Sequence, residues 1–398
     1  MTRLFVRPLV FIAGVCCGLL LCAVVGRVVA HHSYYKNFVR IGGAHQTDVS
    51  FFVTASQIKA MIESQCEKTR TLVVVGGSSV LMGAGQPIRY LWTKRLQQEL
   101  GDKYCVFNLA TPGGGLAGYG SVTMEMLAKE YADAYLVSDT QVPPENPPDG
   151  REWYKHFYWD AYYKGLLKNS PVKREAERTT QIEAQYAIEL PKSRARIEQV
   201  RLGMQLDSYL YFNDLWTWFH YNHYMTVYSP APINLAWGPR SAKPDYDFEV
   251  DANEVRKLKF YPAEDSAAFK SELVVTSRFL DHVIKTPEGM KLDEDFMAAA
   301  DRALRDYPMT DYAGKTVIAI TVDSPYYLDR LPPAEREIGH YRRQREAEIL
   351  EKNGYHAVTL EDVSAADYGD RPHLNTFGGY KLATKVAERI KSLRRDGK

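Results

Sequence analysis

Short apolar runs alternate with helix-like stretches along most of this 398-residue chain, and this alternation constrains the fold more than any other feature. The expected strands are residues 71–75, 105–109, 133–139, 315–322 and 355–360. The expected helices are residues 54–66, 88–100, 120–132, 333–354 and the stretch that follows residue 373. Strands that alternate with helices at this spacing form parallel sheets covered by helices. The sequence therefore predicts an α/β fold.

A proline-rich segment, "SDTQVPPENPPDG" at 138–150, interrupts the alternation. The alternation resumes after about residue 310, so we expect residues 31–398 to form one domain with residues 140–310 as a largely helical insertion. The insertion carries aromatic stretches such as "YLYFNDLWTWFHYNHYMTVY" at 209–228. Such a stripe is typical of a core or a domain contact. A cap over a cleft and a surface resting on a bilayer are the open alternatives.

An uncharged run, "LVFIAGVCCGLLLCAVVG" at 9–26, opens the chain between Arg7 and Arg27. Eighteen apolar residues are just enough to cross a bilayer. We expect residues 1–30 to be a transmembrane anchor, with the N-terminus cytoplasmic beside Arg3 and Arg7 and the main domain extracytoplasmic, in the periplasm or at the cell surface. The small residues at 28–30 leave signal-peptide cleavage as an alternative, but the run is longer than a usual signal core.

Composition narrows the function classes. Lys and Arg total 50 against 49 Asp and Glu, so no net positive field exists to attract nucleic acid. The ten histidines and five cysteines show no ligand spacing, so neither a metal nor another cofactor is expected. Outside the apolar run only Cys66 and Cys105 remain, next to strands that would be neighbours. A disulfide and two buried thiols are equally compatible with this placement.

Two stretches at strand ends carry candidate catalytic residues. "VVVGGSSVLMGAG" at 73–85 places Ser78 and Ser79 in a glycine-rich turn after the first strand, and "DRPH" places Asp370 three residues before His373 after the last strand. A serine needs a base to become a nucleophile, and a carboxylate can fix the tautomer of that base. Ligands of open α/β folds bind at the carboxyl ends of the strands, where both stretches belong.

These stretches resemble the SGNH hydrolases, also called GDSL-type esterases, and in particular a membrane-associated subset. The first block of that family is matched by "VVVGGSSVLMG", the second by "FNLATPG" with Ala110 in place of glycine, and the last by "DRPHLNTFGGYKLA". The third block, Gly-x-Asn-Asp, is missing: "YLVSDTQVPPEN" stands in its place, and neither Asp139 nor Asn146 fits its spacing.

The resemblance implies a three-layer, flavodoxin-like parallel sheet and a catalytic set. It implies Ser78 as the nucleophile, with Ser79 as the competing candidate because Ser79 lies four residues before Gly83. His373 would be the general base and Asp370 its orienting acid. Backbone N–H groups of Ser78 and Gly113 would form the oxyanion hole.

Three other motifs compete with this interpretation. "GGGLAG" at 113–118 satisfies the dinucleotide pattern, with Asp139 as the ribose-binding acid, but it does not follow the first strand. A phosphate loop is disfavoured because no lysine follows the glycines of 76–85. The α/β-hydrolase elbow fails because Val80 stands where it requires glycine.

The expected function is therefore that of an anchored serine ester hydrolase or O-acyltransferase. It would act through an acyl-enzyme on an acylated envelope polysaccharide or another small ester, and the bilayer at residues 9–26 is an expected partner. The resemblance to anchored proteins that work beside membrane-bound O-acyltransferases implies such an enzyme as a further partner. The alternative is a non-catalytic scaffold of the same fold that binds a polysaccharide or that acyltransferase.

Overall fold

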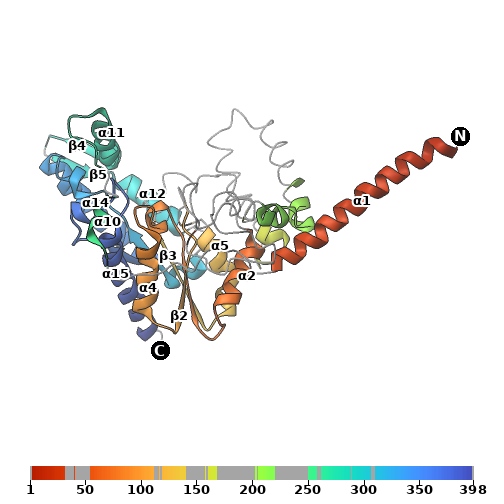
Figure 1. The fold of residues 1–398 in the computed structure, drawn as a ribbon. Coiled ribbons are helices and arrows are strands. Elements are labelled where there is room, and N and C mark those ends of the chain that lie inside the picture. Colours follow the sequence, from red (N-terminus) through yellow and green to blue (C-terminus); the bar gives the residue numbers. More distant parts are fainter. Residues whose placement is uncertain are drawn as a thin grey trace.

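The computed structural model describes residues 2–31, 40, 54–111, 116, 119–139, 157, 160–167, 202–203, 205–219, 250–257, 261–287, 289–305 and 310–396. An α/β domain forms its body, and one long N-terminal helix projects from it (Figure 1). The central sheet has five strands: β1 (Thr71–Val75), β2 (Tyr104–Asn108), β3 (Asp133–Asp139), β6 (Thr316–Ile320) and β7 (His356–Thr359).

The five strands are all parallel and lie in the order β2-β1-β3-β6-β7. Counted along the chain this is 2-1-3-4-5, the order of flavodoxin-like sheets. Every strand lies within two residues of its expected bounds, so the predicted parallel sheet is confirmed.

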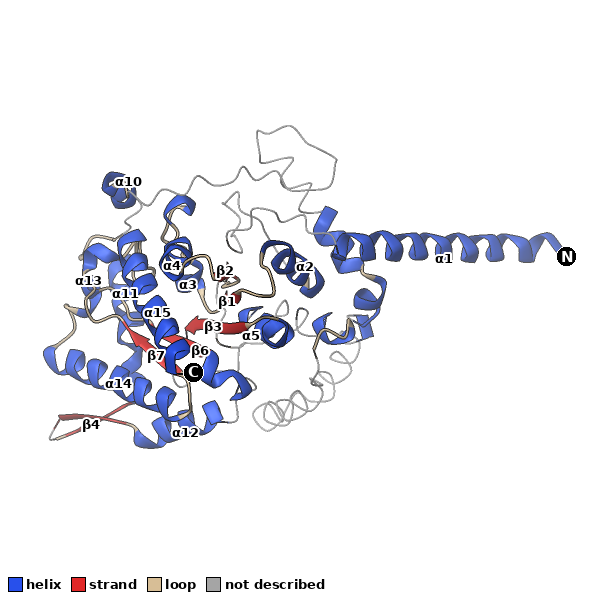
Figure 2. Cartoon of the chain, turned by 90° about the horizontal axis from the view of Figure 1, so that it is seen from below, coloured by secondary structure: helices blue, strands red, loops and turns tan. Residues whose placement is uncertain are grey.

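Helices cover both faces of the sheet (Figure 2). Side chains of β1 alternate between the two faces, as the strand period requires. Val73 and Val75 pack in a cluster with α4 (Trp92–Leu100) and α15 (Thr376–Asp396). Leu72 and Val74 pack in a second cluster with α2 (Ala55–Gln65), α5 (Tyr119–Leu127) and α14 (Pro333–Lys352). A strand buried on both faces explains the unbroken apolar sequence "TLVVV".

The helix expected at 88–100 is divided. Ile88–Tyr90 form a 3-10 turn, and α4 begins only at Trp92. Leu91 between them is extended, with φ −67° and ψ 130°, and the Trp92 N–H donates to Gln86 Oε1 over 2.8 Å. A side-chain acceptor thus replaces the backbone acceptor that a continuous helix would supply.

The described part of the insertion combines helices with one hairpin. It contains α10 (Ala252–Lys257), α11 (Ala267–Thr276) and α12 (Glu294–Arg305), but also an antiparallel hairpin of β4 (Val283–Thr286) and β5 (Gly289–Leu292). Pro287 lies in the turn, and Gly289, at the first position of β5, has a φ of 138° that suits glycine. The sequence pattern did not predict this hairpin within the insertion.

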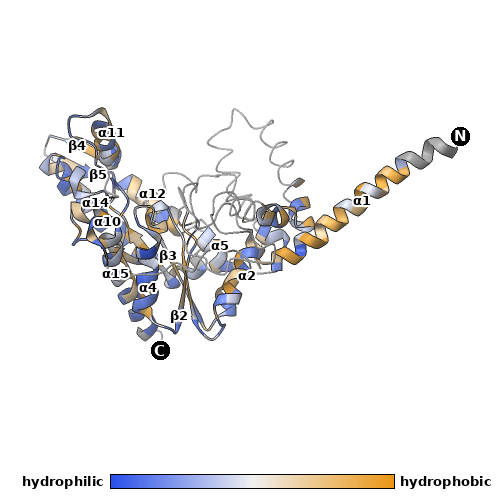
Figure 3. Ribbon diagram, in the orientation of Figure 1, coloured by the Kyte–Doolittle hydropathy of each residue, from blue (hydrophilic) through white to orange (hydrophobic). Residues whose placement is uncertain are grey.

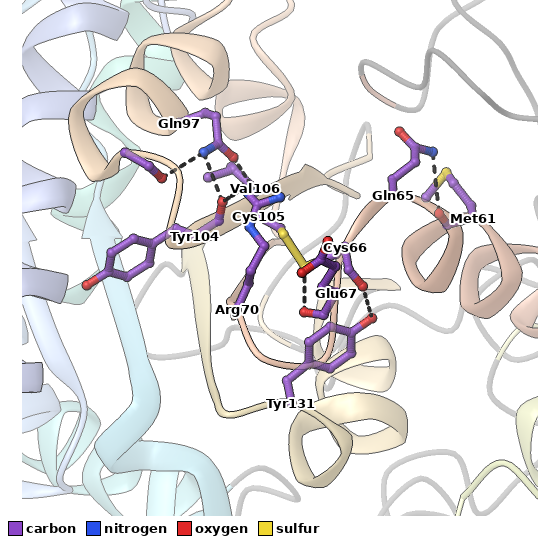
Figure 4. The surroundings of a disulfide bond; sticks show 11 residues. Met61, Gln65, Cys66, Glu67, Arg70, Gln97, Tyr104, Cys105, Val106 and Tyr131 are labelled. Atoms are coloured by element: carbon purple, nitrogen blue, oxygen red, sulfur yellow. Dashed lines mark hydrogen bonds between the residues drawn. A yellow bond between two sulfur atoms is a disulfide. The ribbon is translucent and has the colours of Figure 1, made fainter.

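A disulfide joins Cys66, at the end of α2, to Cys105 in β2, with the Cα atoms 5.9 Å apart (Figure 4). Backbone groups around it are well held: Tyr131 Oη donates to the Cys66 carbonyl, and Gln97 Nε2 donates to the Tyr104 carbonyl over 3.0 Å. Of the two alternatives left open by the sequence, the structure therefore has the disulfide.

The N-terminal helix α1 (Thr2–His31) is long and apolar enough to cross a membrane along Pro8–His31. Only 6% of its most apolar stretch is buried against the rest of the protein. Figure 3 shows this hydrophobic helix projecting from the body. Gly26, Val29 and Ala30, near the C-terminal end of α1, are buried. This end of the helix is therefore packed against the α/β domain.

Candidate active site

Two loops meet at the carboxyl edge of the sheet. The first follows β1 and leads through Gly76 and Gly77 into a short helix, α3 (Ser79–Met82). The second lies between β7 and α15 and carries Asp370 and His373. Parallel strands all end at the same edge, so residues almost 300 positions apart in the chain come together there.

Ser79, His373 and Asp370 form a hydrogen-bonded chain. Ser79 Oγ lies 2.7 Å from His373 Nε2, and His373 Nδ1 lies 2.8 Å from Asp370 Oδ2 and 2.9 Å from Oδ1. Asp370 Oδ1 also accepts the His373 backbone N–H over 2.9 Å, which fixes the loop as well as the ring. The His373 side chain is 22% exposed, so the chain of groups is open to solvent. This geometry suits a serine nucleophile with its base and orienting acid.

Ser78 faces the other way. Its hydroxyl donates to Asp139 Oδ2, its N–H donates to Asp139 Oδ1 over 2.7 Å, and its Oγ accepts the Val80 N–H over 3.2 Å. The structure thus brings the competing candidate, Ser79, to His373, and it holds the preferred candidate, Ser78, as the N-cap of α3. This geometry favours Ser79 over Ser78 as the partner of His373, because a capping side chain turns back toward its own helix.

The glycines explain why this turn has its sequence. Gly77 has a φ of 91°, a conformation that suits glycine, and a Cβ there would lie 2.2 Å from Asp139 Oδ1. Gly76 approaches α5 so closely that a Cβ on Gly120 would lie 2.5 Å from the Gly76 Cα. The paired glycines therefore make room for the carboxylate of Asp139 and for a helix.

A buried arginine that sequence reasoning missed supports the far end of α3. Arg40, with no exposed surface, donates from Nη1 to the Gly83 carbonyl and to the Met82 carbonyl over 3.3 Å. Asn108, at the end of β2, donates from Nδ2 to the Leu81 carbonyl over 3.1 Å. These side chains satisfy the carbonyls that a helix end leaves without intrahelical partners. In the sequence, Arg40 stands in a polar segment with no motif to mark it.

Gln86 joins the two loops. Its Oε1 accepts the N–H of Trp92, and its Nε2 donates to the Leu374 carbonyl over 3.3 Å. Next to it, a Cβ on Gly85 would lie 2.9 Å from the Leu374 carbonyl oxygen and 3.4 Å from His373 Cβ. The loop after α3 therefore packs against the loop that carries Asp370 and His373, which we call the histidine loop. This contact helps to hold Ser79 and His373 at their distance.

Arg371, between Asp370 and His373, anchors the histidine loop from the other side. Its Nη1 contacts Asp323 at 2.7 and 2.8 Å, and its Nε donates to Glu272 Oε2 over 2.6 Å. Asp323 follows β6, whereas Glu272 lies on α11 of the insertion. The insertion thus helps to hold the candidate catalytic loop, a role for which the sequence offered no signal.

The expected oxyanion donors are only partly placed. The Ser78 N–H is occupied by Asp139, so it is not directed into the site. Gly113 lies outside the described residues. The N–H of Ser79 begins α3 and is not used within that helix.

Asp139 lies at the carboxyl end of β3 and is bound to Ser78, which leaves no carboxylate directed toward a ribose there. Most of the glycine pattern at 113–118 lies outside the described residues. Among the described residues, no group of three or more His, Cys, Asp or Glu is placed to hold a metal ion.

We expect Asp139 to make stability depend on pH. Burial raises its pKa to about 6, even though Ser78 donates to it and opposes the rise. A carboxyl with a raised pKa in the folded state takes up its proton there first, so its contribution to stability falls as pH rises from about 4 to about 6. In Asp139→Asn the amide keeps an acceptor for the Ser78 N–H and has no charge to bury. That part of the pH dependence should therefore disappear.

Urea unfolding of the unchanged protein and of Asp139→Asn at pH 4, 5, 6 and 7 measures the difference. Asp139→Ala is the matched control: it leaves the Ser78 N–H without an acceptor and should cost about 1–3 kcal/mol. Parallel stability curves for the unchanged protein and Asp139→Asn across this range would show that the carboxyl does not titrate there.

No family model matches the chain, and a search of curated proteins finds no match. The function is therefore argued from the site itself.

Proposed function

We propose that the protein is a membrane-anchored, extracytoplasmic serine ester hydrolase or O-acyltransferase of the SGNH type. The observation that carries the proposal is the chain from Ser79 Oγ through His373 to Asp370 at the carboxyl edge of the sheet. The three blocks that resemble the SGNH family contribute the parts of this edge. Ser79 takes the place of the nucleophile, His373 that of the general base, and Asp370 that of the orienting acid.

The reaction proceeds in two stages. His373 Nε2 accepts the proton of Ser79 Oγ as the oxygen attacks the ester carbonyl, and negative charge develops on the carbonyl oxygen. The Ser79 N–H is the donor proposed for that charge. When the carbon–oxygen bond of the ester breaks, His373 returns the proton to the leaving alcohol. The product is an acyl group on Ser79.

The acyl group then passes to an acceptor. Water gives hydrolysis, and a sugar hydroxyl gives transfer; in both, His373 takes the proton of the attacking O–H and returns it to Ser79 Oγ. A site that excludes water favours transfer. No step requires a metal or another cofactor.

Two features support an envelope location. Helix α1 is long and apolar enough to anchor the chain, and disulfides such as Cys66–Cys105 persist in oxidising compartments. We therefore place the domain outside the cytoplasm. Esters of envelope polysaccharide are the proposed substrates, and a membrane-bound O-acyltransferase is the proposed partner.

One observation favours a second candidate, a scaffold without catalysis. The third SGNH block is missing, and Asp139, the carboxylate near its position, binds Ser78. A scaffold of this kind would bind a polysaccharide or a membrane O-acyltransferase. The aligned histidine and aspartate weigh against it, because binding alone does not require a tautomer-fixing carboxylate.

A fluorophosphonate probe separates the two candidates. An activated serine forms an Oγ–phosphorus bond and expels fluoride, while His373 takes the hydroxyl proton. We expect the full-length protein in detergent to be labelled at Ser79, as located by peptide mapping, and labelling to disappear in His373→Ala. Labelling at Ser78 would move the nucleophile back to that residue. A folded protein that is not labelled would support the scaffold.

A further inference from the structure

In two helical segments, residues 205–210 and 212–219, polar side chains are buried and large apolar side chains are exposed. This is the reverse of the usual arrangement in a surface helix. The fully buried side chains are polar: Ser208, Asp214 and Thr217 are 1%, 0% and 6% exposed, while Trp218 is partly buried against the core. Large apolar side chains lie outward and are more than half exposed: Leu206, Tyr209, Trp216 and Phe219, with Leu202 just before them. We call these five the apolar face. Five of the eight large apolar residues exposed outside α1 in the described chain belong to it.

Two of the inward polar residues, Ser208 and Asp214, are fixed by a buried network. Ser208 Oγ donates to Asp160 Oδ1 over 3.0 Å, Lys164 Nζ lies 2.9 Å from Asp160 Oδ1 and also contacts Asp214, and Thr54 Oγ1 donates to Asp214. Rotating either segment to hide its apolar residues would expose or strand these charges. The buried network therefore keeps the apolar face exposed, because hiding that face would cost more than exposing it.

These segments lie beside the C-terminal end of α1, as the sequence colours of Figure 1 show. A Cβ on Gly26 would lie 2.4 Å from the Tyr211 carbonyl oxygen, so only glycine fits at this approach. Tyr211 itself has a φ of 55° and separates the two segments. Its ring also lies 6.0 Å from that of His31. The two segments that carry the apolar face thus contact the end of the apolar helix through Tyr211.

The position of the Gly26–Tyr211 contact along α1 sets the depth of the apolar face relative to the bilayer. The apolar run 9–26 spans roughly 27 Å at 1.5 Å per residue, about the thickness of a hydrocarbon core. If α1 crosses the bilayer, Gly26 lies at the boundary and the exposed Arg27 follows it outside. Tyr and Trp gather at this level in membrane proteins because their rings are apolar at one end and polar at the other.

We propose that the apolar face rests in the interfacial region of the lipid bilayer beside α1. The inference depends on the proposed role of α1 as an anchor. A single helix lets a domain swing about its end, whereas a second contact holds it at a fixed height and tilt. The function of the face is to keep the candidate active site in one orientation above the membrane, where envelope acceptors are reached.

Labelling at single cysteines in the full-length chain tests the proposal. The background replaces Cys16, Cys17 and Cys22 with alanine, and keeps the disulfide. Trp216→Cys and Tyr209→Cys each carry an environment-sensitive NBD label, and the proteins are reconstituted in phosphatidylcholine vesicles with and without brominated acyl chains. Leu20→Cys in α1, 66% exposed, reports insertion, and Val274→Cys on α11, 63% exposed, is the matched control away from α1.

Insertion to roughly 5–10 Å should bring the labels at 209 and 216 near the bromines and lower their emission about twofold, while the label at 274 stays unchanged. Quenching at position 20 without quenching at 209 and 216 would overturn the proposal while keeping the anchor, and would indicate that the face covers a protein instead. Absence of quenching at position 20 would overturn the anchor and the inference together.

Discussion

Replacing Ser79 with alanine is expected to lower ester turnover by a factor of about 10⁴ or more, because the proposed nucleophile and its proposed base would act as a unit. Ser79 Oγ is the hydroxyl within reach of His373 Nε2, at 2.7 Å. Hydrolysis of 4-nitrophenyl acetate by the full-length protein in detergent measures the change. The same assay on His373→Ala should show a loss of similar size.

Ser78→Ala is the matched control, since it removes a hydroxyl from the adjacent residue of the same turn. The Ser78 hydroxyl donates to Asp139 and caps α3, so its loss should lower stability by about 1 kcal/mol while most turnover remains. A larger loss of turnover in Ser78→Ala than in Ser79→Ala would restore Ser78 as the nucleophile. Full activity in both variants would remove the serine mechanism altogether.

The sheet could be predicted because its signals are local. Strand β1 is buried on both faces, and a continuous run of apolar β-forming residues records that burial directly. The histidine loop was also predictable, since Asp370 and His373 are close in sequence and bind one another across a single turn.

The choice between Ser78 and Ser79 was not predictable from the motif. Both serines follow the glycines, and their directions depend on a carboxylate 61 residues away at the end of β3. The sequence suggests two roles for Asp139, in the Gly-x-Asn-Asp block and as a ribose-binding acid, whereas in the structure its carboxylate binds Ser78. A side chain that caps a turn from another strand leaves no spacing signal in the sequence.

The side chains that hold the loops of the site in place were even harder to predict from the sequence. Arg40 reaches the carbonyls after α3 from an isolated bridge beside Asn108, and Arg371 binds Glu272 on the insertion. A single charged residue in a polar segment is normally a solvated surface residue. Its burial is decided by tertiary packing, which periodicity does not record.

Replacing Lys164 with alanine is expected to lower the free energy of unfolding by about 3–5 kcal/mol, because two buried carboxylates lose their cation. The side chains of Lys164, Asp160 and Asp214 are 3%, 5% and 0% exposed. Burial by itself would lower the pKa of Lys164, but the two carboxylates outweigh it and raise that pKa, so the lysine is charged. Urea unfolding of the full-length protein in detergent measures the loss.

Lys59→Ala is the control, because it removes a lysine paired with Glu130 at 2.7 Å on the surface, where the two side chains are 23% and 39% exposed. Solvent screens that pair, and its loss should cost about 0–1 kcal/mol. Replacing Lys164 by methionine together with both aspartates by asparagine should cost less than Lys164→Ala alone, since no charge is then stranded.

The network also decides which way residues 205–219 face. Asp214 accepts from Thr54 at the start of α2, and its carbonyl accepts from Gln57 Nε2 over 3.0 Å, so these residues are tied to the body beside α1. If Lys164→Ala changed stability by less than about 1 kcal/mol, the buried charges would not hold these residues. The apolar face would then lack the support that keeps it outward. If Lys164→Ala instead loses stability by the expected amount and the label at position 216 is quenched less in that variant, the two results have one cause. The charges buried on one side of the helix then hold the apolar side chains on its other side against the lipid.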